Sequence, residues 1–124
     1  MPVPLAVALG GALGVSARYG LDRLIERRSD ALFPWSTFTI NITGCLVIGV
    51  IVGALVDRHH TPAWLRVGLV MGVLGGYTTF STYAQETFGL LDAHDFAVGI
   101  TYAGGSVVLG VLAVWIGMRV GHAL

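Results

Sequence analysis

The 124-residue sequence contains no lysine and little charge of either sign. Charged residues make up 11% of the chain, whereas about a quarter is usual in a soluble domain. The seven basic residues are all arginines and are balanced by seven carboxylates. We therefore expect no basic patch of the kind that binds nucleic acid. Hydrophobic residues reach 55%, with a mean hydropathy of +0.79. These values predict a multi-pass membrane protein.

Cysteine and histidine are also scarce. Cys45 is the only cysteine, which excludes an intrachain disulfide, and we expect it to be a small apolar helix residue. The histidines lie in predicted loops or at the chain end, without metal-ligand spacing: His59, His60, His94 and His122. No nucleophile–base pair, P-loop or dinucleotide motif is recognisable, so no enzyme is predicted. The first apolar run lacks a charged leader, so we expect a mature helix and not a cleaved signal peptide.

Four apolar segments are long enough to cross a bilayer, at about residues 3–21, 34–56, 63–91 and 96–118. The third exceeds the roughly 20 residues that a crossing needs. At its centre, Gly75 and Gly76 precede a run of hydroxyl side chains. We therefore predict one all-α domain over residues 1–124, with the third transmembrane helix broken at its centre into two half-helices joined by an unwound turn.

The distribution of arginines barely favours either orientation in the membrane. An even number of spans puts both termini on one side, with Arg58, Arg66 and Arg119. The opposite side holds Arg23, Arg27 and Arg28, with Arg18 near the same boundary. Orientation follows the Lys/Arg excess of short loops, so both orientations are compatible with this sequence. Insertion both ways allows an antiparallel dimer; a single orientation set by other features is the alternative.

Small residues recur at a spacing that lets helix backbones approach closely. The pairs are Gly10 and Gly14, Gly49 and Gly53, Ser106 and Gly110, and Gly117 and Gly121. This spacing predicts close helix contacts without locating a dimer face.

Polar side chains at bilayer depth are concentrated between Gly75 and Glu86. Lipid cannot satisfy such groups, so they must be buried against protein or line a watery path. Other deep polar residues, most of them hydrogen-bond donors suited to an anion, are Ser16, Arg18, Asn41, Thr43, Tyr102 and Ser106. Phe80 and Tyr83 share a helical face. They are either packing residues or contacts for an anion, because the edges of aromatic rings carry partial positive charge. Freed carbonyls of the unwound turn, such as those of Gly75 and Thr78, would suit Na⁺.

These residues carry a resemblance to the Fluc (CrcB) family of fluoride channels. The matching motifs are Gly10-Gly11-Ala12-Leu13-Gly14, Arg18-Tyr19, Thr37-Phe38-Thr39-Ile40-Asn41-Ile42-Thr43-Gly44 and Gly75-Gly76-Tyr77-Thr78-Thr79-Phe80-Ser81-Thr82-Tyr83, with Tyr102 and Ser106 in the fourth segment. The resemblance implies an antiparallel dual-topology homodimer in the bacterial inner membrane. It also implies two fluoride pores and a central structural Na⁺, held by the Gly75 and Thr78 carbonyls of both subunits.

The resemblance also implies a function for each site residue. Phe80 and Tyr83 would be the aromatic box residues, and Asn41 a fluoride donor at a vestibule. Polar positions near the ion path would be Ser81, Thr82, Tyr102 and Ser106. Glu86 matches a carboxylate near the pore, although it could be an interfacial group at a helix end, and Arg18 matches an arginine at the pore entrance. Tyr83 departs from the usual Phe, and its hydroxyl could donate to fluoride or to the chain.

The function implied is passive, selective export of F⁻ that relieves fluoride toxicity. A small dual-topology, proton-coupled multidrug transporter is the main alternative, and that class needs a deep carboxylate. The first span has none before Asp22 at its end, and Glu86 is the other candidate. A structural membrane subunit without conduction is a third reading. The dense polar run of the third segment argues against it, because such groups are costly to bury idly.

Overall fold

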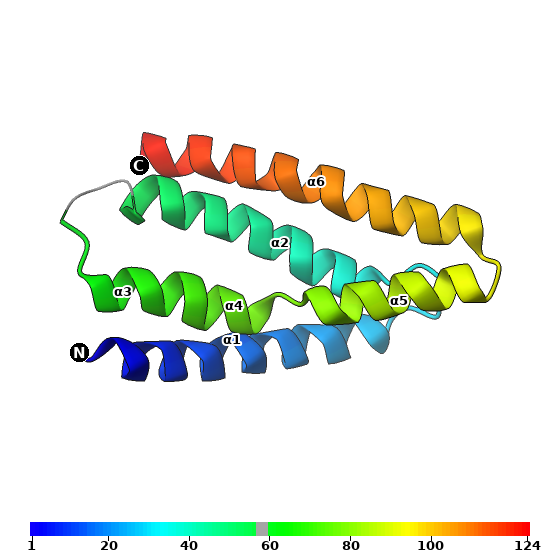
Figure 1. Cartoon of the computed structure of the whole chain (residues 1–124), viewed down its shortest axis with the longest axis horizontal. Helices are drawn as coiled ribbons and strands as arrows, with labels where there is room; N and C mark the ends of the chain where they lie inside the picture. The colour runs from blue at the N-terminus through cyan, green and yellow to red at the C-terminus, as the bar shows by residue number, and fades with distance from the viewer. Residues whose placement is uncertain (57–59) are drawn as a thin grey trace.

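The computed structural model describes residues 1–56 and 60–124 (Figure 1). Arg58 and His59, which entered the arginine and histidine arguments above, lie outside the described residues. The elements are α1 (Val3–Glu26), α2 (Trp35–Ile51), η1 (Val52–Val56), α3 (Ala63–Val67), η2 (Gly68–Leu74), α4 (Gly75–Tyr77), α5 (Phe80–Asp92) and α6 (Phe96–Ala123), where η denotes a π-helical segment. These residues contain no β-strand, which confirms the all-α prediction.

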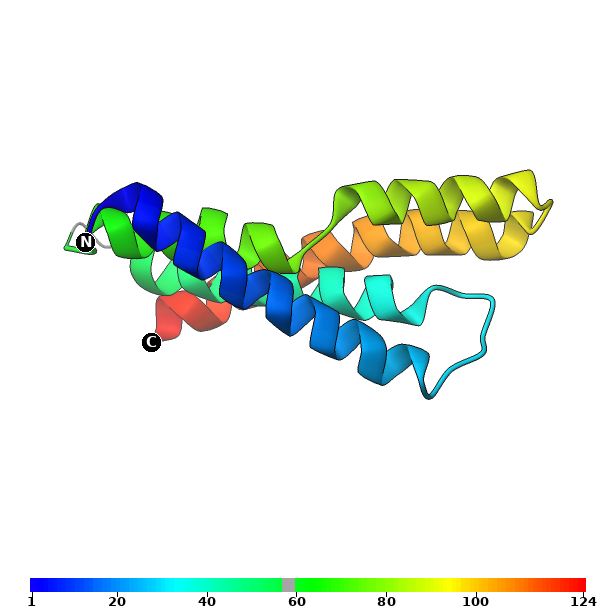
Figure 2. The same ribbon diagram turned by 90° about the horizontal axis from the view of Figure 1, so that it is seen from below.

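The helices form two close pairs. α6 runs along α2 and η1, and α1 runs along α3, η2 and α4 (Figure 1). Beyond α4 the chain turns toward α6, and α5 packs against the first half of that helix. As a result, α5 and α6 diverge from α1 and the start of α2 (Figure 2). Both termini lie at the opposite end of the molecule from the α5–α6 turn (Figure 1).

Glycines bring α1 into direct backbone contact with η2. A Cβ atom built on Gly10 would lie 2.5 Å from the carbonyl oxygen of Gly68, and one on Gly72 would lie 2.9 Å from that of Val7. A Cβ on Gly14 would overlap the carbonyl of Val73. Neither helix could keep this separation with a larger residue at these positions, because packed interiors have no room for extra atoms.

A second glycine contact joins α2 and η1 to α6. Gly49 lies against Gly117, with 3.0 Å between a Cβ built on Gly49 and the Gly117 Cα. Gly53 faces Gly121 in the same way, at 3.2 Å. Three of the four small-residue pairs therefore form helix contacts within the chain itself, of the kind that small residues permit.

The third predicted span is interrupted, which confirms the predicted break. Gly75 and Gly76 themselves are helical, and the chain becomes extended at the next two threonines. Thr78 has φ −83° and ψ 161°, and Thr79 has φ −150° and ψ 117°. Because β-branched residues favour extended backbone, these threonines suit the non-helical turn better than the glycines do.

Two stretches of the described residues, Trp35–Leu55 and Phe96–Ala123, are long and apolar enough to cross a bilayer, with mean hydropathies of 2.2 and 1.9. α1 contains Arg18 and several glycines, which lower its hydropathy, and the break divides the third predicted span into shorter helices. α1 and α6 also continue beyond their predicted ends at residues 21 and 118, to Glu26 and Ala123. The count of four spans stays a prediction.

Candidate functional site

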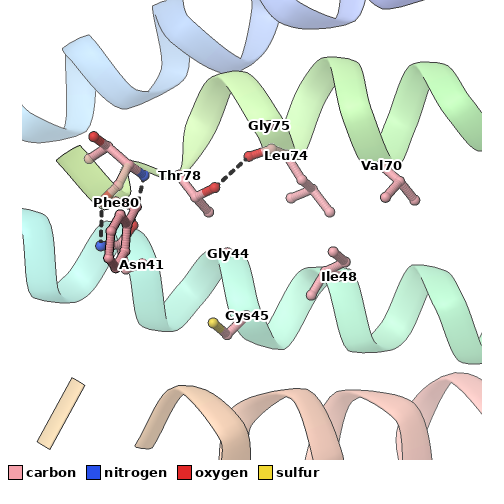
Figure 3. A pocket seen from close by; sticks show the side chains of 10 residues that line it. Asn41, Gly44, Cys45, Ile48, Val70, Leu74, Gly75, Thr78 and Phe80 are labelled. Atoms are coloured by element: carbon pink, nitrogen blue, oxygen red, sulfur yellow. Dashed lines mark hydrogen bonds between the residues drawn. The ribbon is translucent and has the colours of Figure 1, made fainter. Parts of the chain in front are cut away.

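The break in the third helix is tied to α2 by the side chain of Asn41. The Asn41 Nδ2 donates to the carbonyl oxygen of Thr79 at 3.0 Å, and the Thr79 N–H donates to Asn41 Oδ1 at 2.9 Å (Figure 3). One side chain thus satisfies both backbone groups of an extended residue, and such pairing is required where water is excluded. The amide keeps one N–H bond that these contacts do not use.

Backbone carbonyls are released at the same break, those of Gly75 and Thr78 among them. In a continuous helix, the N–H of Thr79 would donate to Gly75 and that of Thr82 to Thr78. Here the Thr79 N–H donates to Asn41, and the Thr82 N–H donates to the Thr79 hydroxyl at 3.4 Å. The Thr78 N–H and hydroxyl both donate to the Leu74 carbonyl at 2.9 Å. The Gly75 and Thr78 oxygens are therefore left out of the helical hydrogen-bond ladder.

A cavity of about 320 Å³ lies between α2 and the segment from η2 to Phe80. Its apolar lining comes from Cys45 and Ile48 on one side and Val70 and Leu74 on the other, with Asn41, Gly75 and Thr78 at its polar end (Figure 3). Phe80 follows the break and has 78% of its surface exposed. An apolar ring so exposed needs another molecule, either lipid or protein, to cover it.

Side chains from α2 and α6 converge on Glu86 of α5. Thr37 Oγ1 donates to Glu86 Oε1 at 2.8 Å, and the Tyr102 hydroxyl donates to Oε2 at 2.6 Å. The Tyr102 ring is completely buried, and its centroid lies 5.4 Å from that of Tyr83. Tyr83 in turn lies 5.7 Å from the exposed Phe80. The aromatic pair of the sequence analysis is thus connected through Tyr102 to the carboxylate.

The hydrogen bonds of Glu86 favour the interpretation of this residue as part of a polar site. A carboxylate at a helix end facing headgroups would make its contacts with water. Glu86 is half-buried, and each of its oxygens accepts a hydroxyl from a neighbouring helix. Glu86 thus belongs to a polar cluster between α2, α5 and α6, and its place beside an ion path stays a prediction.

The Tyr83 hydroxyl is used by the chain itself. It donates to the backbone carbonyl of Ala103 at 2.8 Å, and so fastens α5 to α6. Of the two partners considered for this hydroxyl, fluoride and the chain, the structure contains the second. The ring remains beside Phe80 and Tyr102.

The other predicted polar residues differ in how their hydroxyls are used. Thr82 accepts a hydrogen bond from the Thr79 hydroxyl at 3.0 Å, and Ser81 lies exposed at the start of α5. The Ser106 hydroxyl oxygen is buried, one helical turn from Tyr102, and has no partner in the described part of the chain. Buried hydroxyls are normally hydrogen-bonded, so Ser106 has a donor free for a small ligand or water.

Arg18 lies on the other side of the break, half-buried in a separate cavity of about 220 Å³. Thr37, Thr79 and Thr82 line this cavity together with Asp22. Within residues 1–56 and 60–124, the Arg18 guanidinium forms no ion pair. The cavity thus combines the Arg18 guanidinium with threonine side chains and the Asp22 carboxylate.

The sequence analysis missed the contacts made by the first turn of α2. Ser36 donates a hydrogen bond to Asp22 of α1, while the adjacent Thr37 donates to Glu86 of α5. Ser36 and Thr37 are also the buried polar residues among those described. The only available signal was a pair of hydroxyls at the start of an otherwise apolar segment.

Comparison with known proteins gives one consistent result. Residues 5–118 match the family described as CrcB-like protein, Camphor Resistance (CrcB). A relative from Acidobacterium capsulatum, named fluoride-specific ion channel FluC, is 45% identical over 122 residues, covering 97% of this chain and 96% of its own. Relatives of the same name from Nitratidesulfovibrio vulgaris and Chloroflexus aurantiacus are 40% and 43% identical, covering 94% and 95% of this chain and 94% of their own.

The double hydrogen bond of Asn41 predicts a stability effect. Asn41→Ala leaves the Thr79 N–H and carbonyl unpaired, and is expected to lower the free energy of unfolding by about 1–3 kcal/mol. The measurement is denaturant unfolding of the purified protein in detergent, followed by circular dichroism. Leu46→Ala is the control, because this side chain lies on the exposed face of the same helix. Equal losses in both variants would mean that the amide does not hold the break.

Proposed function

The chain belongs to the CrcB family, and from this membership we propose that it is a fluoride-selective channel through which F⁻ leaves the cytoplasm passively. The observation that carries the proposal is the connected series of Phe80, Tyr83, Tyr102 and Glu86. The buried Ser106 hydroxyl, which has no partner among the described residues, lies one helical turn from Tyr102. The three relatives described above are named fluoride-specific ion channels, which supports the same conclusion. A channel of this kind is not an enzyme and changes no covalent bond.

The driving force for export is the membrane potential. HF crosses a membrane as a neutral molecule and dissociates in a less acidic cytoplasm, which traps F⁻ inside. A negative interior then favours outward movement of the anion by about 2.3 kcal/mol per 100 mV. The expected location is therefore the bacterial inner membrane, where export relieves fluoride toxicity.

Selectivity follows from replacing the hydration shell of a small anion. Among residues 1–56 and 60–124, the donors for which no partner is found include the second Asn41 N–H, the Ser106 hydroxyl and the Arg18 guanidinium. The ring edges of Phe80 and Tyr83 add partial positive charge. A narrow path with these groups fits F⁻, whereas Cl⁻ is larger and attracts donors more weakly.

Two copies of the chain are needed to complete such a path. Phe80 is largely exposed, and the cavity beside it opens at the surface of the protomer. An antiparallel homodimer would cover both and would give each of two pores residues from both subunits. The balanced arginines are compatible with insertion in either orientation, although Arg58 lies outside the described residues.

A structural Na⁺ fits the residues at the break. The carbonyls of Gly75 and Thr78 lack their usual helical donors, and carbonyl oxygen is a preferred ligand of hard cations. Two oxygens are too few for such a cation, so the same pair from a second subunit would have to contribute. When bound, the ion would add a fixed positive charge near the anion path, and the chain's own part is to hold these carbonyls free through Asn41 and Thr79.

The transporter alternative has less support. A proton-coupled transporter of cations needs a deep carboxylate that is free to bind substrate. Both oxygens of Glu86 are engaged by Thr37 and Tyr102, and Asp22 accepts from Ser36. These contacts favour the channel.

The proposal predicts selective anion efflux. Liposomes containing the purified protein are expected to release F⁻ rapidly and to retain Cl⁻, as measured with ion-selective electrodes. Phe80→Ile removes the ring but keeps an apolar side chain, and should reduce F⁻ release to that of empty liposomes. Comparable Cl⁻ release by the unmodified protein would contradict the proposed selectivity. Absence of F⁻ release from folded protein would contradict the channel itself.

Tyr83→Phe should conduct F⁻ at a changed rate. The substitution keeps the ring and removes only the hydroxyl that donates to Ala103. A loss of about 1 kcal/mol in the free energy of unfolding is expected from the missing hydrogen bond. Efflux and unfolding are measured on the same preparation. If the Phe variant conducted and the unmodified protein did not, the hydroxyl would be a block and the proposal would fail for this chain.

Removal of Na⁺ tests the cation and the dimer together. The purified protein is expected to have the mass of a dimer by light scattering, and a higher melting temperature in NaCl than in the chloride of a large organic cation. Carbonyls from both subunits would hold the ion, so the dimer is also expected to dissociate more readily without it. A melting temperature independent of Na⁺ would remove the ion from the proposal, and a monomer that conducts F⁻ would remove the dimer.

A further inference from the structure

The segment between α1 and α2 brings a phenylalanine against the buried tyrosine. The ring centroid of Phe33 lies 4.4 Å from that of Trp35 and 5.3 Å from that of Phe38. It also lies 5.4 Å from that of Tyr102, with an interplanar angle of 83°. Of these three aromatic residues, Phe33 is the one whose ring contacts Tyr102 in the described part of the chain.

Tyr102 is consequently in contact with two rings. The ring centroid of Tyr83 lies 5.4 Å from that of Tyr102 at an interplanar angle of 58°, and Phe33 lies at the same distance, nearly perpendicular. The Tyr102 side chain has 0% exposure, so its position is fixed by these neighbours and by its hydrogen bond to Glu86. A displacement of the ring would carry its hydroxyl away from the carboxylate.

Phe33 and its neighbours in the same segment also line a cavity of about 170 Å³. Its lining includes polar groups of Glu26, Ser29, Ser36 and Glu86, with Phe33 and Trp35 as an apolar wall. Glu86 therefore borders this cavity as well as the buried cluster with Tyr102. Phe33 also lines this cavity, and its ring contacts that of Tyr102. It therefore separates the Tyr102 ring from the polar cavity.

We propose that Phe33 is a positioning residue at the end of the ion path, where its ring fixes Tyr102 so that the Tyr102 hydroxyl stays on Glu86. The inference rests on the proposed channel function and concerns the rate of conduction. Phe33 itself need not touch the ion. It acts through Tyr102 and keeps that part of the path separate from the cavity under the α1–α2 segment.

An aromatic ring is required for this function because of its charge distribution. Perpendicular aromatic pairs are stabilised beyond their buried area, since the positive edge of one ring meets the negative face of the other. Leucine at position 33 would fill most of the volume of the ring but would lose this orientation-dependent stabilisation. Tyrosine would keep it.

The experiment compares F⁻ efflux from liposomes containing three variants. Phe33→Leu is expected to slow efflux by roughly two- to tenfold, the loss expected when one oriented ring pair no longer holds Tyr102. Phe33→Tyr should conduct within about twofold of the unmodified protein because the ring pair is kept. Phe38→Leu is the matched control, since Phe38 belongs to the same aromatic cluster and does not line the cavity. Phe33→Met is a second apolar replacement if Phe33→Leu does not fold.

Two results would overturn the inference while leaving the proposed function intact. The first is equal efflux from Phe33→Leu and Phe38→Leu, with F⁻ release by the unmodified protein. The second comes from the double variant Tyr102→Phe with Phe33→Leu. Because Tyr102→Phe already lacks the hydroxyl, adding Phe33→Leu is expected to slow efflux no further. A full additional slowing there would mean that Phe33 acts independently of Tyr102. No F⁻ release by the unmodified protein would instead contradict the channel.

Discussion

The double hydrogen bond between Asn41 and the backbone of Thr79 is the interaction on which the site depends. A helix in a bilayer cannot be interrupted unless the released backbone groups find partners within the protein. Asn41 supplies both a donor and an acceptor from α2, at 3.0 and 2.9 Å. Because the Thr79 N–H is taken by the side chain, the Gly75 carbonyl is released, and α5 starts in a new direction.

The glycine contacts make that interaction possible by fixing the distance between helices. Gly44 lies against Thr78, where a Cβ atom would overlap the threonine methyl group. α2 can therefore come close enough for Asn41, one turn away on the same helix, to reach the break. Glycine contacts also fix the helices on either side of the break. They join η2 to α1 and α2 to α6. Backbone proximity, more than apolar side-chain volume, positions the polar residues, as is usual where lipid weakens the hydrophobic effect between helices.

The sequence was sufficient for the features that depend on composition and local pattern. Low charge and long apolar segments predicted helices, and the Gly75–Tyr83 run predicted a break. It could not predict the π-helical segments η1 and η2, because the register of a helix depends on what packs against it. Nor could it predict that Thr37 meets Glu86 or that Phe33 meets Tyr102, since these pairs are 49 and 69 positions apart and depend on how the helices cross. Tyr83 was recognised as unusual, but its bond to Ala103 required the structure.

The distribution of hydrogen bonds separates polar groups that build the site from those that remain free for an ion. Hydroxyls of Thr37, Thr79 and Tyr102 are already donated to acceptors of the chain. A group engaged in this way can bind an anion only by giving up its bond, which costs free energy at each step. The Ser106 hydroxyl and the second Asn41 N–H carry no such cost. On the proposed function, F⁻ would dwell at these few free donors. It would pass the engaged ones only as they exchange partners, so the spacing of free and engaged donors would set the conduction rate.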